Sequence, residues 1–186
     1  MQRTGVNRRI KEIIIYVAVF LALIAIDQIT KFYFKNKYFE DGTTKIINNF
    51  FYFTYAENTG AAFSFLAGKS WAQLFFKIIT AVALVVFTFL TVYFFKKKQK
   101  WLTVSMIITL SGTIGNYIDR LALNYVRDFI SFVFGSYRFP VFNIADVCLV
   151  VGVIMISVYL LFLDKDAVFK RKNGKEDIQD CWKYKS

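Results

Sequence analysis

Two aspartates lie in or beside long apolar segments, where a carboxylate is energetically costly. As a pair, they could carry out acid–base chemistry. Asp128 lies between two such segments and Asp146 lies inside the second. Placing a carboxylate at membrane depth costs roughly 2.5 kcal/mol or more. Two neighbouring carboxylates do not both ionise easily, so one holds a proton near neutral pH. The ionised partner can then take a proton from water while the protonated one donates to a carbonyl oxygen. This is the chemistry of peptide hydrolysis.

Further polar residues precede this pair, and each also has a purely structural interpretation. Asp27 is followed one helical turn later by Lys31, the spacing of an ordinary ion pair. Asn58 with Gly60 is typical of a tight turn that lets another part of the chain approach closely. On local grounds both interpretations of each group stay open.

One face of the third apolar segment combines small and polar residues. Gly112, Gly115, Asn116 and Asp119 have the spacing of a single helical face. Small residues permit close contact with another helix, and the asparagine and aspartate can bond across it. Asp119 beside Arg120 is also compatible with an ion pair without a catalytic role. Structural support is therefore the favoured interpretation of Asn116 and Asp119.

The start of the fourth apolar segment has two explanations as well. Asn143 followed three residues later by Asp146 matches a helix-capping arrangement. The residues around Asp128 are aromatic and β-branched, which predicts a strand or a re-entrant turn.

The elements that position these residues are predicted to be transmembrane helices. The chain has 186 residues, of which 56% are hydrophobic and 19% aromatic. Four apolar runs are long enough to cross a bilayer, which takes about 20 residues each. They lie near residues 13–34, 73–95, 101–121 and 142–163. We therefore expect a membrane all-α fold, a four-helix transmembrane bundle forming one domain over residues 1–186.

Two connecting segments are predicted on the outer side of the membrane. They span about residues 35–70 and 122–141. Asp41-Gly42 is a turn signal, and residues 45–55 are rich in Ile, Phe, Tyr and Thr. We expect a small extracytoplasmic β-sheet lying on the outer membrane surface, with residues 45–65 placed to cover a cleft.

The basic residues predict the orientation of the chain. They concentrate before the first apolar run, between the second and third, and in the tail at 164–186. With four crossings these regions share one side, and the positive-inside rule places both termini in the cytoplasm. Nucleic-acid binding is not expected, because no aromatic–basic interleaving or binding motif accompanies the basic runs.

Composition also excludes several reaction classes. The chain has no histidine, which removes Ser-His and Cys-His catalysis. Its two cysteines, Cys148 and Cys181, lie far apart, so neither a disulfide nor a Cys/His zinc site is expected. A Ser-Lys pair using Ser64 or Ser111 stays open. No metal is needed for hydrolysis by a pair of carboxylates, and none is predicted.

The predicted topology brings the polar residues to one depth. Asp27 and Asp119 lie toward the outer ends of two helices, and Asp146 begins a helix that returns inward. Asn58 and Asp128 lie in the outer segments. Independent ion pairs and helix caps would have no reason to lie at the same depth, so the pattern favours a shared site.

The polar residues occur in motifs with a family resemblance. Asp27 in the first helix is followed by ENTGAAFSF, GNYIDR, VRDF and FNIAD. This ordered set resembles the five motifs of lipoprotein signal peptidase, also called signal peptidase II, from Asp27 through Gly152. The resemblance implies an aspartic membrane endopeptidase that needs no cofactor. Its substrate would be a bacterial prolipoprotein, cut before a cysteine that bears a diacylglyceryl group.

The resemblance also implies roles for individual residues. Asp128 in VRDF and Asp146 in FNIAD match the catalytic pair. The positions that shape or support the site are Asp27, Asn58, Gly60, Asn116, Asp119, Arg120 and Asn143. The implied partners are the prolipoprotein, membrane lipids and globomycin-type inhibitors. The implied setting is the bacterial inner membrane, with a monomer whose active site faces the outer leaflet.

One residue departs from the family pattern. Arg127 stands directly before Asp128, where a small apolar residue is usual. A guanidinium beside a carboxylate lowers the pKa of that carboxylate. Neighbouring strand residues face opposite sides, so we predict that Arg127 points away from the pair.

Two other functions compete with hydrolysis. A proton-coupled transporter or channel would use the buried acids as a relay, which requires charges at several depths. A non-enzymatic membrane scaffold would use the Gly112/Gly115 face for helix packing but leaves Asp128 and Asp146 unexplained.

Overall fold

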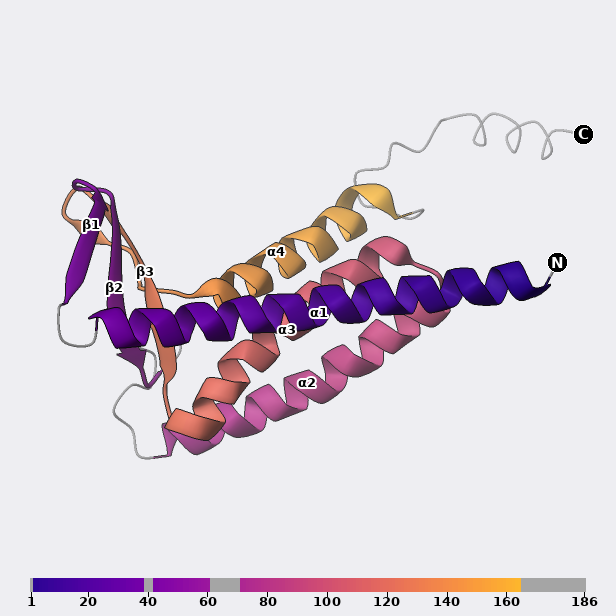
Figure 1. The fold of residues 1–186 in the computed structure, drawn as a ribbon, viewed down its shortest axis with the longest axis horizontal. Helices are drawn as coiled ribbons and strands as arrows, with labels where there is room; N and C mark the ends of the chain where they lie inside the picture. The colour runs from indigo at the N-terminus through magenta and orange to yellow at the C-terminus, as the bar shows by residue number, and fades with distance from the viewer. Residues whose placement is uncertain (1, 39–41, 61–70, 165–186) are drawn as a thin grey trace, which may run out of the picture.

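The computed structural model describes residues 2–38, 42–60 and 71–164, with four long helices that end at a small sheet (Figure 1). The helices are α1 (Gln2–Tyr38), α2 (Ala72–Lys96), α3 (Lys100–Leu123) and α4 (Ile144–Val158), and α4 continues into a π-helical segment, η2 (Tyr159–Leu163). The strands are β1 (Thr43–Ile47), β2 (Phe51–Asn58), β3 (Val126–Phe134) and β4 (Tyr137–Arg138). The sheet lies at one end of the helices and the N-terminus at the other.

Helix α3 is the centre of the helical layer, because it contacts each of the other three helices. Its hydroxyl side chains are buried, and each donates a hydrogen bond to a backbone carbonyl four residues earlier. These residues are Thr103, Ser105, Thr109, Ser111 and Thr113. Polar groups satisfied within their own helix can be buried at little cost. Ser111, one of the two serines considered for a Ser-Lys pair, is used in this way.

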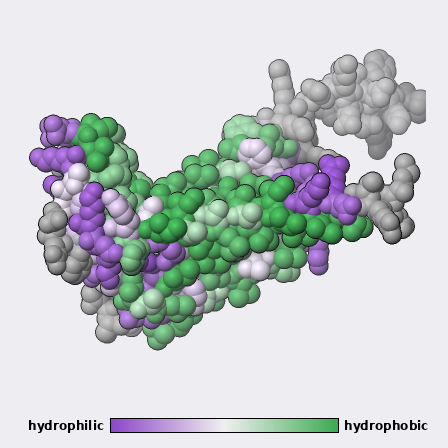
Figure 2. Space-filling view, viewed as in Figure 1, coloured by the Kyte–Doolittle hydropathy of each residue, from purple (hydrophilic) through white to green (hydrophobic). Residues whose placement is uncertain are grey.

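Three helical spans are long and apolar enough to cross a membrane. They are Val6–Tyr38, Ala72–Lys96 and Ile144–Leu163. Their large apolar side chains are widely exposed, and Figure 2 shows this apolar surface between two polar ends. The expectation of four apolar spans is confirmed for these three only. Helix α3 is not among them, because the hydroxyl and amide side chains that it buries against its neighbours lower its hydropathy.

The sheet has the order β1-β2-β3-β4 with antiparallel neighbours. Between β2 and β3, Ala56 lies opposite Asp128 and Asn58 opposite Val126. The predicted strands at residues 45–55 and around Asp128 are thus confirmed. The sheet rests on the end of α1, where the ring of Phe34 stacks on that of Phe129 with centroids 4.3 Å apart. This aromatic contact fixes the position of β3 relative to α1.

Some boundaries differ from the sequence-based expectation. Helix α1 extends well beyond 13–34 and is about 55 Å long at 1.5 Å per residue. That exceeds a hydrocarbon layer of about 30 Å, so part of the helix lies beyond it. Lys, Arg and Glu before residue 13 are good helix formers, which explains the extension.

Helix α4 begins at Ile144 and not at 142, because Asn143 caps it. Several predictions lie partly or wholly outside the described residues. These are the turn at Asp41, residues 61–65 of the covering segment, Ser64, Cys181 and nearly all of the tail 164–186.

Candidate active site

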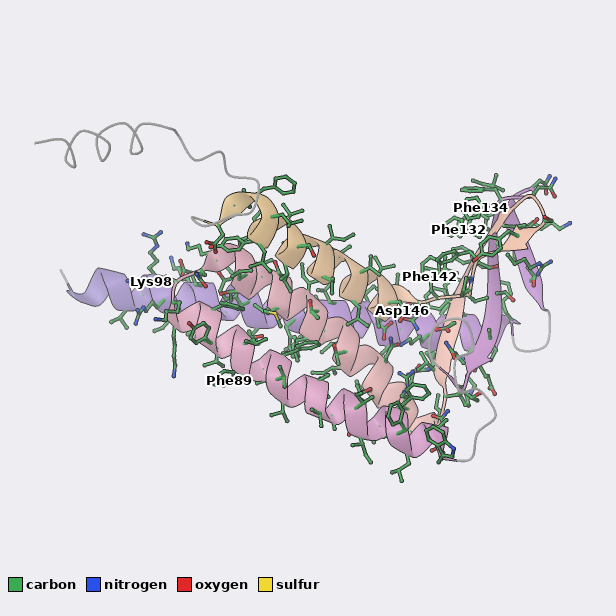
Figure 3. The ribbon with its side chains drawn as sticks, turned by 180° about the vertical axis from the view of Figure 1, so that it is seen from behind. Phe89, Lys98, Phe132, Phe134, Phe142 and Asp146 are labelled. Atoms are coloured by element: carbon green, nitrogen blue, oxygen red, sulfur yellow. The ribbon has the colours of Figure 1, made fainter. Side chains whose placement is uncertain are left out.

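Asp128 and Asp146 line the same cleft, which has a volume of about 1060 Å³. Asp128 is the third residue of β3 and is 2% exposed. Asp146 lies in the first turn of α4, at the end of the helix that faces the sheet (Figure 3). The two carboxylates predicted to act together are thus brought to one cavity from two different elements.

Backbone pairing between β3 and the entry to α4 creates this arrangement. The N–H groups of Phe129 and Ile130 donate to the carbonyl of Phe142, and the N–H of Phe142 donates to the carbonyl of Ile130. These bonds hold the residue before Asn143 against the strand that contains Asp128. The chain therefore enters α4 directly beside that carboxylate.

The predicted cap at the start of α4 is confirmed. The Asp146 N–H donates to Asn143 Oδ1 at 3.0 Å, and the Asn143 N–H donates to Asp146 Oδ2 at 3.1 Å. This is a reciprocal capping box, which satisfies two backbone donors at the helix start. Capping and cleft formation use the same two side chains, so the two interpretations of the motif do not compete.

Asn143 joins the two aspartates. Its Nδ2 donates to Asp128 Oδ1 at 2.6 Å and to Asn116 Oδ1 at 3.1 Å, and its side chain is fully buried. Asn116 in turn donates to Asp146 Oδ1 at 2.8 Å, and Asn58 donates to Asp128 Oδ2 at 3.0 Å. Each carboxylate therefore accepts two hydrogen bonds that fix its orientation.

The orientation of each asparagine amide follows from a partner that can only donate. An ammonium has no acceptor, so the bond from Lys31 Nζ at 2.9 Å places Asn116 Oδ1 toward Lys31. The N–H groups of Gly60 and Asp146 do the same for the Oδ1 atoms of Asn58 and Asn143. With each carbonyl oxygen occupied in this way, all three NH₂ groups face the carboxylates.

Lys31 lies at the centre of a buried charge cluster behind the cleft. Its Nζ is 2.8 Å from Asp27 Oδ2 and 3.5 Å from Asp119 Oδ2, and its side chain is 0% exposed. The ion pair expected from the Asp27–Lys31 spacing is confirmed, and it is buried inside the protein. The pair is buried because α3 supplies both Asp119 and Asn116 as additional partners. A buried ion pair needs such extra hydrogen bonds to offset desolvation.

Asp27 also connects α1 to the start of α4. Its Oδ1 accepts a hydrogen bond from the Ala145 N–H at 2.9 Å. A β-carbon added at Gly115 would lie 2.5 Å from Asp27 Oδ2, so the close approach of α3 requires glycine there. The predicted close-packing face of α3 is confirmed at this contact.

Arg127 faces away from the cleft, as predicted, and binds Asp119. Arg127 Nη2 donates to Asp119 Oδ1 at 2.6 Å, and Nε donates to Asp119 Oδ2 at 3.2 Å. The Arg127 backbone N–H adds a third bond at 3.0 Å, and Nη2 also donates to Gln28 Oε1 at 2.9 Å. Arg127 therefore connects β3, one position before Asp128, to Asp119 of α3 and Gln28 of α1. Asp119 consequently pairs with Lys31 and Arg127, and not with the adjacent Arg120.

Arg120 supports another part of the cleft. Its Nη2 donates to the carbonyl of Gly60 at 3.1 Å, and its guanidinium lies over the ring of Phe76 at 5.2 Å. The Gly60 N–H donates to Asn58 Oδ1 at 3.0 Å. Arg120 therefore holds the turn that presents Asn58 to Asp128.

Burial and charge make Asp128 a proton-holding group near neutral pH. Removal from water, together with the charge of Asp146, raises the pKa of Asp128 from 3.8 to about 7. Hydrogen bonds from Asn58 and Asn143 act in the opposite direction and are outweighed. The two carboxylates are thus suited to share one proton.

The cleft combines this polar base with an apolar wall. Phe139, Pro140, Val141 and Phe142 line it from the sheet side, and Val147 and Val150 line it from α4. The described part of the chain holds no group of three or more His, Cys, Asp or Glu placed to bind a metal. The cleft therefore offers an apolar surface leading to two carboxylates.

The structure brings the predicted site residues into one connected network. Asp27, Asn58, Gly60, Asn116, Asp119, Arg120 and Asn143 each bond to a cleft residue or to a residue that does. Sequence reasoning missed the central role of Lys31 and the participation of Gln28. The available signal was an ammonium one turn from Asp27 inside an apolar segment.

Known proteins with the same organisation identify the family. The family profile described as signal peptidase (SPase) II matches residues 19–162. A lipoprotein signal peptidase of Enterococcus faecalis is 39% identical over 162 residues, which cover 87% of this chain and 96% of that protein. One of Bacillus pumilus is 39% identical over 149 residues, which cover 78% of this chain and 92% of that protein.

A solved structure described as a bacterial membrane enzyme superposes with a TM-score of 0.69 at 33% identity. The match covers 83% of this chain and 94% of that one. Sequence and fold agree over most of the chain, and the family profile spans all the residues that form the cleft. The chain therefore belongs to the signal peptidase II family, the lipoprotein signal peptidases.

Proposed function

We propose that this family member is an aspartic endopeptidase of the bacterial inner membrane, with Asp128 and Asp146 as its catalytic pair. It removes the signal peptide from diacylglyceryl-modified prolipoproteins, cutting before the lipidated cysteine. The observation that supports this most directly is the connection through Asn143. One buried amide bonds to Asp128 while the same residue's backbone bonds to Asp146. Two carboxylates are thereby held toward one cavity.

At the start of the catalytic step, the two carboxylates together carry one proton. Asp128 holds it, because burial and the Asp146 charge raise the pKa of Asp128 to about 7. Asp146 takes a proton from water as the water oxygen attacks the scissile carbonyl carbon, and Asp128 gives its proton to the carbonyl oxygen. The tetrahedral intermediate then collapses. The C–N bond breaks, the amine nitrogen receives the proton from Asp146, and Asp128 regains its own from the hydroxyl.

The asparagines contribute by fixing these carboxylates before substrate arrives. Each carboxylate oxygen accepts one hydrogen bond and keeps a lone pair for water or a proton. Charged groups held in place by fixed dipoles need no reorganisation during the reaction. Asn58, Asn116 and Asn143 are thus positioning residues, and the carboxylates alone exchange protons.

The substrate suits the shape and setting of the cleft. A signal peptide is an apolar helix, and a diacylglyceryl group fits an apolar wall such as that formed by Phe139 and Val150. We place the cleft at the outer headgroup level, with the sheet on the outer surface and both termini in the cytoplasm. Helix α3 would be the fourth crossing, because its polar side chains are satisfied inside the bundle. The active form would be a monomer that globomycin-type peptides inhibit.

The distribution of charge disfavours a proton relay. The buried charged side chains of the described residues are Asp27, Lys31, Asp119 and Asp128. They form one network at the sheet end, whereas a relay requires ionisable groups at several depths. A single reaction centre fits this distribution better.

Cleavage of a diacylglyceryl-modified prolipoprotein by the purified chain in detergent tests the proposal. Asp128→Asn and Asp146→Asn should each lower kcat by roughly 10²–10⁴-fold, the contribution of a positioned acid or base. Glu12→Gln is the matched control. It makes the same carboxylate-to-amide change at the far end of α1 and should leave the rate unchanged. If either cleft variant keeps a rate close to that of the wild type, the pair is structural and the mechanism is wrong.

A further inference from the structure

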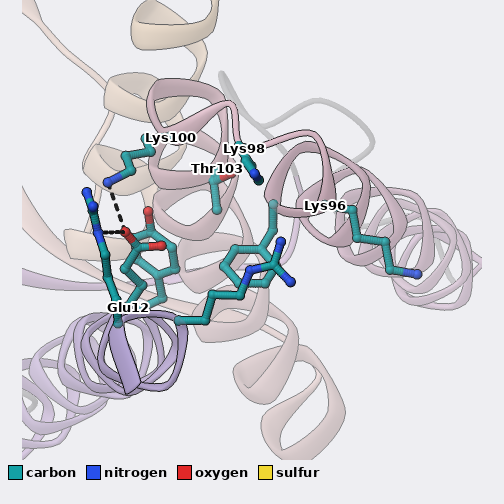
Figure 4. Close-up of a pocket in the computed structure, with 9 residues that line it drawn as sticks. Glu12, Lys96, Lys98, Lys100 and Thr103 are labelled. Carbon is teal, nitrogen blue, oxygen red and sulfur yellow. Dashed lines mark hydrogen bonds and ion pairs between the residues drawn. The ribbon is translucent and has the colours of Figure 1, made fainter. Parts of the chain in front are cut away.

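A second cavity lies at the opposite end of the helices from the sheet. Its volume is about 470 Å³, and it lies among α1, the end of α2 and the start of α3 (Figure 4). The charged residues that line it are Arg8, Arg9, Glu12, Lys96, Lys98 and Lys100, and we call it the basic pocket. None of these residues belongs to the network around Asp128 and Asp146.

Positive charge in the basic pocket exceeds what its one carboxylate can neutralise. Glu12 Oε1 is 2.9 Å from Lys100 Nζ and 3.7 Å from Arg8 Nε. Among residues 2–38, 42–60 and 71–164, no salt bridge involves Arg9, Lys96 or Lys98, and Arg9 reaches Glu12 only through longer-range attraction. The positive-inside rule explains why cations occupy this end of the helices. That rule does not explain why cations from three parts of the chain line one concave site.

The pocket also has an apolar side. Tyr16 of α1 and Phe95 of α2 line it, and their rings meet edge to face with centroids 6.1 Å apart. Just along the same two helices, Ile13 is 46% exposed and Val92 is 46% exposed, on surfaces that face the surroundings of the bundle. A free inorganic anion would use the cations and leave this apolar surface uncovered. A molecule with an anionic head and hydrocarbon chains would use both.

Position along the helices agrees with such a ligand. Lys98 lies at the far end of the bundle from Asp146 in Figure 3. Helices α1 and α2 are both long and apolar enough to cross a membrane, and they contribute Glu12, Tyr16 and Phe95 to the pocket. The cations of the pocket mark where these apolar helices become charged, which is the depth at which lipid headgroups lie.

We propose that the basic pocket binds the phosphate headgroup of an anionic phospholipid, with its acyl chains lying along α1 and α2. Basic pockets between transmembrane helices are suited to phospholipid headgroups because they combine charge with access from the membrane. A lipid seated there would join α1 to the link between α2 and α3. The proposal is independent of the peptidase chemistry, and variants in this pocket should cleave prolipoprotein normally in detergent.

Native mass spectrometry of the purified full chain in detergent tests the proposal, with phosphatidylglycerol as probe and phosphatidylcholine as the zwitterionic reference. Arg9→Gln combined with Lys98→Gln should weaken phosphatidylglycerol binding roughly 30-fold, as expected for the loss of two cations near a headgroup. Lys11→Gln combined with Lys97→Gln is the matched control. It removes the same charge from the same two regions but outside the pocket, and should preserve binding.

A variant that is expected to strengthen lipid binding keeps the test informative if the double variant folds poorly. Glu12→Gln frees Lys100 and Arg8 from their carboxylate and should tighten phosphatidylglycerol binding severalfold. Equal losses in both double variants would show diffuse surface attraction and overturn the proposal. So would full displacement of the lipid by millimolar inorganic phosphate, or equal binding of phosphatidylcholine.

Discussion

Two lysine–carboxylate pairs, one at each end of the bundle, have almost the same length and very different surroundings. At the sheet end, Lys31 lies 2.8 Å from Asp27, with side chains 0% and 2% exposed. At the other end, Lys100 lies 2.9 Å from Glu12, with side chains 60% and 28% exposed. Contact distance alone therefore does not distinguish a pair that organises the site from a pair on the surface.

The difference lies in what else each pair contacts. Lys31 also bonds to Asn116 and approaches Asp119. Its removal would leave the buried Asp27 carboxylate without a cation and Asp119 with Arg127 alone. Lys100 and Glu12 are accessible to water, which can replace either partner. Exposed pairs contribute little because solvent screens them, whereas breaking a buried pair leaves an uncompensated charge. The sheet end should thus respond to single substitutions and the other end should not.

The largest expected effect is that of Lys31→Met. This change should lower stability by about 3–5 kcal/mol, the usual effect of removing one partner from a buried ion pair. Cleavage should fall at least tenfold as well, because Asn116 Oδ1 loses one of the two donors that direct the Asn116 NH₂ group to Asp146. Thermal unfolding in detergent and prolipoprotein cleavage measure the two effects.

Lys100→Met is the matched control at the other end, and should leave both the melting temperature and the cleavage rate unchanged. If Lys31→Met and Lys100→Met had equal melting temperatures, the buried pair would contribute no more to stability than the exposed pair, and the comparison would be wrong. A large loss in Lys100→Met would show that the exposed pair is structural.

The second expected effect is a pH dependence of stability that originates at Asp128. Its pKa is raised from 3.8 to about 7 in the folded chain, so between these values the folded state keeps a proton that the unfolded state has lost. Stability should therefore fall as the pH rises from about 4 to about 7, by about 2–4 kcal/mol in total, and then level off. Below pH 4 both states are protonated and the contribution vanishes.

Unfolding of the wild type and Asp128→Asn across pH 4–8 measures this contribution as the difference between two curves. The wild type should lose stability relative to the variant as the pH rises through this range. Parallel curves would show that Asp128 does not hold the proton.

The sequence predicted those parts of the fold that depend on local pattern. Apolar runs predicted where three membrane-spanning helices lie, and the spacing of Asn143 and Asp146 predicted the capping box. Both are properties of consecutive residues, whose geometry follows from the backbone alone. The same locality explains the prediction that Arg127 faces away from Asp128, since strand neighbours alternate.

The remainder depends on contacts between distant segments. Strands β2 and β3 are separated by α2 and α3, so no turn fixes the register that places Asn58 near Asp128. The burial of Lys31 was not predicted, because its partners Asn116 and Asp119 are more than eighty residues away in the sequence. The polar side chains that lower the hydropathy of α3 are likewise buried among the other helices, and local composition does not reveal that burial.

The smallest expected effect concerns Arg127, which belongs to the buried cluster but retains 11% exposure. Arg127→Lys should lower kcat about tenfold with little change in KM, because an ammonium cannot reproduce the two guanidinium bonds to Asp119. The backbone bond from residue 127 to Asp119 survives the substitution and limits the loss. Arg127→Val should be more severe, so that lysine gives partial rescue.

The pH–rate profile separates positioning from direct electrostatics in these Arg127 variants. The guanidinium bonds to Asp119 and Gln28 and not to Asp128, so the acid limb of kcat should keep its midpoint while the plateau falls. If Arg127→Val instead moves that limb upward, the guanidinium lowers the pKa of the Asp128–Asp146 pair. The supporting cluster and the carboxylates proposed to be catalytic would then not be separate, because one cation would act on both.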